Sequence, residues 1–219
     1  MKKTSPTGTV IIILIILLPL MYAGSIYSSL PDTIPIHFNL SGEADGYGNK
    51  NSIWVITLLM AAVSAGVYLL MKNLPRLDPK KTAGQSPELY HKIGISLVIF
   101  ICAITIVMVY ASRNRSININ HLLLPLLGLL FMVMGNYMHS VKPNYFVGFR
   151  IPWTLENEDN WRKTHQLAGK LWVAGGLLIT ICTLLLPARF GFISFLAIIF
   201  IITVIPGVFS YRHFKNHQH

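Results

Sequence analysis

The sequence predicts an all-α protein, a polytopic bundle of six transmembrane helices with an ordered outer loop and a polar, aromatic cytoplasmic loop. Hydrophobic residues make up 53% of the chain and charged residues only 12%, against about 25% charged residues in a typical soluble domain. The apolar residues also fall in blocks of about twenty, the length that crosses roughly 30 Å of hydrocarbon as a helix. We therefore expect a single integral membrane domain over residues 1–219.

Each of the six apolar blocks is long enough to span a membrane. They cover approximately residues 9–27, 52–71, 93–111, 117–138, 167–186 and 190–211. The first block follows two lysines, as a signal peptide would, but its length and the lack of a convincing cleavage site favour a retained helix. The longest polar segments left between the blocks are the outer loop, residues 30–51, and the cytoplasmic loop, residues 139–166.

The distribution of Lys and Arg predicts the orientation, since positively charged loops stay in the cytoplasm. Fourteen of the 18 Lys and Arg residues fall in the N-terminus, the second and fourth loops and the tail, including Lys2, Lys3, Lys80 and Lys81. Both termini are therefore expected to be cytoplasmic. The net charge of +10 is explained by this topology and by attraction to anionic lipids, so we expect no direct contact with nucleic acid.

The outer loop is expected to be ordered. Its apolar residues alternate with polar ones, which is the period of a half-buried strand: Ile34, Ile36, Phe38 and Leu40. Ser41-Gly42 and Asp45-Gly46 are turn signals.

Polar side chains of the outer loop are candidates for contact with a ligand or peptide: His37, Asn39, Glu43 and Asp45. His37, Glu43 and Asp45 could converge on a metal ion or accept protons, but their spacing follows no metal-site rule. We favour a structural explanation, in which His37 and Asn39 lie on the polar face of a strand and the acids cap turns. Neither a metal nor a cofactor is expected.

The cytoplasmic loop leads into the fifth span. Thr154 is expected to cap a helix that begins within residues 155–160 and continues into the membrane. Candidates for an inner platform are Arg150, Trp153, Glu156, Trp161, Arg162 and His165. An aromatic and basic segment at a span entrance is also typical of an interfacial anchor. Arg150 and His165 could instead pair with nearby acids such as Asp159.

Signatures of other function classes are missing from the sequence. There is no zinc-binding helix motif, nucleophile elbow or phosphate-binding loop, and no charged residue is expected near the bilayer midplane, where pumps and channels place ionisable groups. Cys102 and Cys182 fall inside spans, where a thiol packs as a small apolar residue. The protein is therefore not expected to be an enzyme.

Both polar loops carry long motifs. The outer loop reads Leu-Pro-x-x-Ile-Pro-Ile-His-Phe-Asn-x-x-Gly-Glu-Ala-Asp-Gly-Tyr-x-Asn-Lys at residues 30–50. The cytoplasmic loop reads Asn-Tyr-x-x-Gly-Phe-Arg-x-Pro-Trp-Thr-Leu-x-Asn-Glu-x-x-Trp-x-Lys-Thr-His at residues 144–165. Together with the Pro75–Pro79 run, these motifs resemble those of the SdpI family of bacterial membrane proteins, and the resemblance covers most of the chain.

The resemblance implies an immunity protein of the bacterial plasma membrane that protects the cell from a secreted, membrane-active killing peptide. It also implies a receptor that, in the presence of toxin, holds a small DNA-binding autorepressor at the membrane. The expected partners are thus the toxin peptide, such a repressor on the cytoplasmic side, and membrane lipids. A small-molecule or peptide transporter remains an alternative, as does a membrane-embedded enzyme with a metal held, for instance, by His37 and His121.

Overall fold

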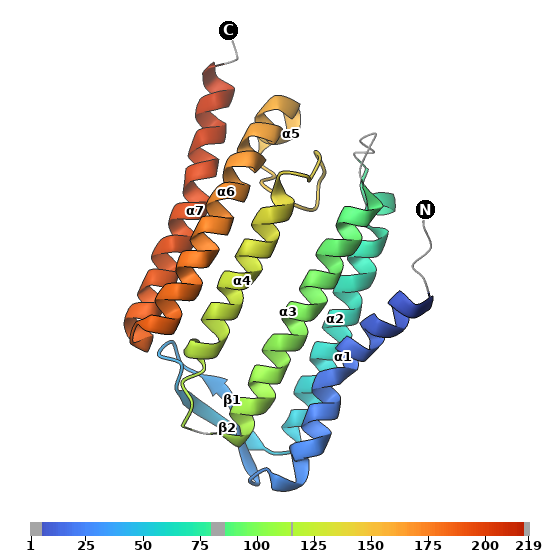
Figure 1. Cartoon of the computed structure of the whole chain (residues 1–219), viewed down its shortest axis with the longest axis vertical. Helices are drawn as coiled ribbons and strands as arrows, with labels where there is room; N and C mark the ends of the chain where they lie inside the picture. The colour runs from blue at the N-terminus through green and yellow to red at the C-terminus, as the bar shows by residue number, and fades with distance from the viewer. Residues whose placement is uncertain (1–5, 80–85, 115, 217–219) are drawn as a thin grey trace.

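Two groups of three long helices stand side by side in the computed structural model, which describes residues 6–79, 86–114 and 116–216 (Figure 1). The first group consists of α1 (Pro6–Ile26), α2 (Ser52–Leu77) and α3 (Pro87–Arg113), and the second of α4 (Asn120–Met138), α6 (Glu158–Leu185) and α7 (Ala188–Asn216). Within the described ranges, six helices are long and apolar enough to cross a membrane. The predicted fold class is confirmed.

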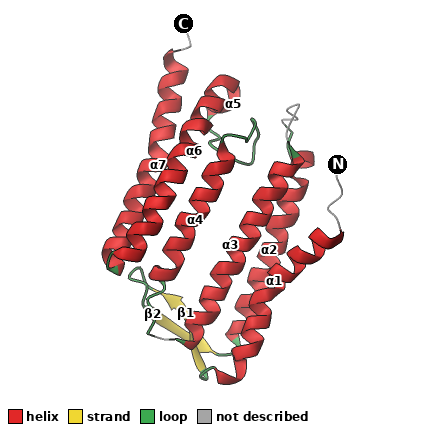
Figure 2. Ribbon diagram, viewed as in Figure 1, coloured by secondary structure: helices red, strands yellow, loops and turns green. Residues whose placement is uncertain are grey.

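Shorter elements lie at the two ends of the bundle (Figure 2). One end carries a 3₁₀ turn, η1 (Tyr27–Ser29), and an antiparallel hairpin of β1 (Thr33–Phe38) and β2 (Ala44–Asn49). The other end carries the short helix α5 (Pro152–Glu156), together with the N-terminal end of α1 and the C-terminal end of α7. The shorter elements and the loops between the long helices therefore lie at one end of the bundle or the other.

The surface of the long helices is suited to lipid. Large apolar side chains point outward on several helices; Leu59 in α2 is 61% exposed and Phe200 in α7 is 68% exposed. A soluble protein rarely leaves such continuous apolar surface in water. With the six apolar helices, this surface makes the chain a multi-pass membrane protein.

Glycines bring α4 and α6 into close contact. A Cβ atom placed on Gly135 would lie 2.8 Å from the carbonyl oxygen of Gly169, and one placed on Gly169 would lie 2.8 Å from that of Gly135. Small residues at such positions let two backbones approach, which is a common way for helices to associate in lipid.

Most of the helices extend beyond the expected spans; α2, for example, ends at Leu77 rather than at residue 71. Two further differences concern the starts of helices. The long helix α6 is capped by Asn157, whose side-chain oxygen accepts a hydrogen bond from the Asn160 N–H at 2.9 Å. Thr154 lies instead inside α5, so its expected role as the cap of the long helix is wrong. The fourth helix begins at Asn120 rather than at residue 117, because the residues before it hold the hairpin.

Some residues used in the orientation argument lie outside the described residues: Lys2, Lys3, Lys80, Lys81 and Arg115.

Candidate functional site

The hairpin at one end of the bundle is fixed to the start of α4. The Asn118 amide donates to the carbonyl of Ser41 at 2.7 Å, and the Asn120 amide donates to the carbonyl of Leu40 at 2.9 Å. The backbone N–H of Ile119 donates to the carbonyl of Gly42 at 2.9 Å. Three hydrogen bonds from consecutive residues thus hold the tip of the hairpin.

The tip requires glycine at position 42. Its φ of +81° lies in the left-handed region, which side chains other than glycine rarely adopt. A Cβ atom there would also lie 2.9 Å from the backbone nitrogen of Asn120. The predicted turn at Ser41-Gly42 is therefore confirmed, and its geometry is needed for docking onto α4.

The base of the hairpin is anchored to the other group of helices. Ile34 is fully buried in a cluster with Ala23 and Ile26 of α1, Ile53 of α2 and Val109 of α3. At the edge of this contact Lys50 pairs with Asp32 at 3.0 Å. The hairpin therefore spans both groups of helices, with its base on α1–α3 and its tip on α4.

The strand lies where the sequence predicted it, but not all of its apolar residues are buried as expected. Ile34 is buried, but Ile36 is 47% exposed and Leu40 is 77% exposed. The pairing of β1 with β2 is irregular after Pro35, and such irregularities redirect side chains. Asp45-Gly46, expected as a turn, lies within β2.

The four candidate residues of the outer loop lie close together on the hairpin. His37 Nδ1 is 2.6 Å from Asp45 Oδ1, and these side chains are 71% and 43% exposed. The Asn39 side-chain oxygen accepts a hydrogen bond from the Glu43 N–H at 3.1 Å. The result is an exposed patch that carries two carboxylates and one imidazole beside the apolar side chains of Ile36 and Leu40.

The two histidines considered for a metal site, His37 and His121, each contact a different partner. The Nδ1 atom of His121 lies 3.2 Å from the carbonyl oxygen of Thr183, whereas His37 pairs with Asp45. Among the residues that the structure describes, no three His, Cys, Asp or Glu side chains come together in a group that could hold a metal ion.

At the opposite end of the bundle, the loop before α5 is folded around a buried asparagine. Asn144 is fully buried, and its side-chain oxygen accepts hydrogen bonds from the N–H groups of Phe146 and Val147 at 2.8 and 2.7 Å. Its amide donates to the carbonyls of Lys142 and Val147. One side chain thus replaces the backbone pairing that the loop lacks.

His165 links this loop to α6. The backbone N–H of Phe149 donates to His165 Nε2 at 3.0 Å, and Nδ1 lies 2.7 Å from the carbonyl oxygen of Trp161. Because Nε2 accepts and Nδ1 faces an acceptor, the ring is the neutral tautomer with its proton on Nδ1. The expected pairing of His165 with an acid is therefore wrong. Gly148 has a φ of +105°, and because it has no side chain, the loop can pass close to the imidazole ring of His165.

Trp161 is 1% exposed and belongs to the same assembly. Its ring stacks on that of His165 with centroids 4.0 Å apart, and its Nε1–H donates to the carbonyl of Val141 at 2.8 Å. Trp161 and His165 thus lie in the interior, where they hold the platform in place and do not present themselves to a partner.

A second buried amide joins α5, α6 and α7. The Asn160 amide donates to the carbonyls of Trp153 and Ser210, and its oxygen accepts from the hydroxyls of Thr164 and Ser210. Every hydrogen-bonding position of this amide is filled, as burial requires.

The remaining platform candidates lie at or near the surface. Arg150 donates to the carbonyl of Tyr145 rather than pairing with an acid. Arg162 lies 2.6 Å from Asp159, which also pairs with Lys163 at 2.7 Å. Trp153 is half-buried and packs edge-on against Tyr211 of α7, with ring centroids 5.5 Å apart, while Glu156 is exposed.

Four asparagines carry much of this architecture: Asn118, Asn120, Asn144 and Asn160. The sequence reasoning gave none of them a specific partner. Their position in or beside loops was the available signal, because asparagine pairs readily with backbone groups there.

Comparison with known proteins supports one family. The SdpI/YfhL protein family model matches residues 140–210, and a domain of unknown function, DUF1648, matches residues 14–61. The chain is 22% identical over 207 residues to the immunity protein SdpI of Bacillus subtilis (strain 168), an alignment that covers 94% of this chain and 96% of the relative. The predicted resemblance to the SdpI family is confirmed.

Each of the two family matches contains one of the two polar ends. The SdpI/YfhL match contains the cytoplasmic loop with Asn144, Asn160 and His165, and the DUF1648 match contains the whole hairpin. No solved structure matches the chain.

We expect the double variant Asn118→Ala, Asn120→Ala to loosen the hairpin tip. Each side-chain hydrogen bond contributes about 0.5–1.5 kcal/mol, so amide hydrogen exchange at Gly42 and Glu43 should accelerate at least about five-fold. Asn114→Ala is the matched control, because its amide donates to the carbonyl of Tyr110 in the preceding helix and not to the hairpin. Unchanged exchange in the double variant would contradict this anchoring.

We expect His165→Leu to destabilise the protein by about 1–3 kcal/mol, since it leaves the buried N–H of Phe149 without an acceptor. Unfolding in detergent micelles, followed by tryptophan fluorescence, measures the change. Gln166→Ala, at the exposed next position, should stay within about 0.5 kcal/mol of the parent protein. Equal stability of the two variants would show that the His165 contacts do not hold the loop.

Proposed function

We propose that this protein is an immunity protein that protects a bacterial cell from a secreted, membrane-active killing peptide. The observation that carries the proposal is the similarity to the Bacillus subtilis immunity protein SdpI, which extends over nearly the full length of both chains. Immunity to a peptide that attacks the membrane requires a protein in that membrane, and the six apolar helices fit this requirement.

The distribution of charge supports an orientation with the hairpin outside and both termini in the cytoplasm. At the hairpin end, the described Lys and Arg residues are Lys50, Arg113 and Arg189. At the opposite end they are Lys72, Arg76, Lys92, Lys142, Arg150, Arg162, Lys163, Lys170, Arg212 and Lys215. In this orientation the hairpin is the part of the chain that an arriving peptide meets first.

The hairpin has the chemistry to bind an amphipathic, basic peptide. Glu43 and Asp45 offer negative charge, and Asn39 and His37 offer hydrogen bonds. Leu40, 77% exposed, offers apolar contact beside them. A peptide that inserts into membranes has both basic and apolar faces, so such a mixed surface is complementary to it.

A receptor role would use the opposite end. Arg150, Trp153, Glu156 and Arg162 surround the cytoplasmic loop, where a small DNA-binding repressor could dock while Trp161 and His165 hold the platform from within. Toxin on one face would alter the other only if two arrangements of the bundle bind it with different affinity. The hairpin that joins both groups of helices is the element through which binding would favour one arrangement.

The proposal is tested by the survival of a sensitive Bacillus strain exposed to the secreted killing peptide, with and without this protein. We expect the protein to protect, and the triple variant His37→Ala, Glu43→Ala, Asp45→Ala to lose most of this protection. Arg189→Ala, an exposed change at the same end but outside the hairpin, should protect as the parent does. Western blotting of membrane fractions confirms that each variant is present.

Two results would count against the proposal. Sensitivity of cells that carry the parent protein would contradict an immunity function against this peptide. Full protection by the triple variant would leave immunity in place but contradict the assignment of the contact surface to the hairpin.

A further inference from the structure

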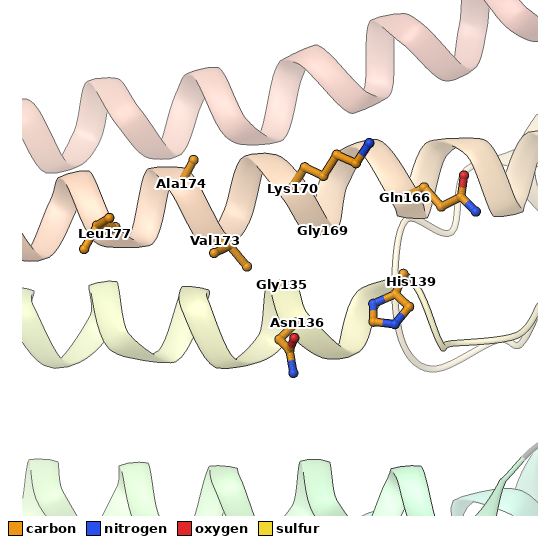
Figure 3. A pocket seen from close by; sticks show the side chains of 9 residues that line it. All are labelled: Gly135, Asn136, His139, Gln166, Gly169, Lys170, Val173, Ala174 and Leu177. Atoms are coloured by element: carbon orange, nitrogen blue, oxygen red, sulfur yellow. The ribbon is translucent and has the colours of Figure 1, made fainter.

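A groove of about 710 Å³ follows the exposed surface between α4 and α6 (Figure 3). Its floor contains Gly135 and Gly169, the same pair that lets the two helices approach. Its other lining side chains are all exposed. The groove is therefore open toward the surroundings of the bundle rather than closed inside it.

The two ends of the groove differ in polarity. Toward the cytoplasmic end it is lined by Asn136, His139, Gln166 and Lys170. Farther along α6 it is lined by Val173, Ala174 and Leu177. One molecule lying in the groove would meet hydrogen-bonding and cationic groups at one end and only apolar groups at the other.

The boundary between these ends matches the depth of a lipid headgroup. Helix α6 ends at Leu185, and a rise of about 1.5 Å per residue places Gln166 roughly 30 Å from that end, which is the thickness of the hydrocarbon core. The polar end of the groove thus lies at the interface, while the side chains of Val173 and Leu177 lie within the hydrocarbon.

The polar end is positively charged and has unused donors. No acid lines the groove, and the nearby carboxylate of Asp159 is already paired with Arg162 and Lys163. In the part of the chain that the structure describes, Lys170, Gln166 and Asn136 have no side-chain hydrogen bond or ion pair with the protein. A phosphate group would supply the acceptors that these donors lack.

We propose that this groove binds one anionic glycerophospholipid of the cytoplasmic leaflet. The phosphate lies against Lys170 and the amides of Gln166 and Asn136, and one acyl chain follows Val173 and Leu177. A lysine without such neighbours could reach the interface simply by extending its side chain, and it would indicate no binding site. Two amides and an imidazole beside it, over a floor of glycines, make a shaped headgroup site. The site stands apart from both the hairpin and the platform.

Native mass spectrometry of the full-length protein, released from micelles with added phosphatidylglycerol or phosphatidylcholine of the same acyl chains, tests this inference. We expect one phosphatidylglycerol to be retained in preference to phosphatidylcholine. Lys170→Gln should weaken its retention on the order of five-fold, the effect of one cation near an anionic headgroup. Arg212→Gln, an exposed cation at the inner end of α7, should leave retention unchanged.

A second pair of variants tests the apolar end. Val173→Trp should fill the groove and lower phosphatidylglycerol retention, whereas Leu178→Trp, at a position that is 52% exposed and does not line the groove, should not. All four positions are exposed, so folding is not at risk.

Several outcomes would overturn the inference. Equal retention of the two lipids, or equal losses in Lys170→Gln and Arg212→Gln, would indicate nonspecific attraction. Displacement of the lipid by millimolar inorganic phosphate would assign the polar end to a free anion. A dimer that Val173→Trp dissociates would show that a second copy of the chain occupies the groove.

Discussion

The hydrocarbon core offers no hydrogen-bond partners, and this constraint organises the structure. Backbone groups at that depth must pair within helices, and polar side chains are moved to the two ends. At those ends the chain leaves helical structure and must satisfy its backbone in other ways. Asn118 and Asn120 do this at the hairpin end, and Asn144, Asn160 and His165 do it at the opposite end. The parts that can bind partners are therefore also the parts where side chains replace regular backbone pairing.

Both polar ends connect the same two groups of helices. At one end, the hairpin packs Ile34 against α1–α3 and fastens its tip to Asn118 and Asn120 at the start of α4. At the other end, Asp78, which follows α2, accepts a hydrogen bond from the N–H of Tyr145 at 3.3 Å. These two connections are the physical basis of the coupling between toxin binding and repressor docking that we propose.

The sequence predicted much of the fold because lipid imposes a simple pattern: blocks of about twenty apolar residues are helices. It also placed the strand at Ile34 and the turn at Gly42. It could not place the cap of α6 at Asn157, since Thr154 is an equally suitable residue and only the packing of α5 decides between them. The burial of His165 and Trp161 was hidden for a similar reason. A polar aromatic segment can lie at the interface or fold inward, and the choice depends on the acceptors and donors supplied by residues 141–149.

We propose that the hairpin faces the outside of the cell and the platform faces the cytoplasm, and thiol labelling tests this orientation directly. Single cysteines at Leu40 and Ser140, introduced after replacing Cys102 and Cys182 by alanine, are treated in intact cells with a membrane-impermeant thiol reagent. Both positions are exposed. We expect Leu40→Cys to be labelled in intact cells and Ser140→Cys to be labelled only after the membrane is opened. The reverse pattern would contradict this orientation.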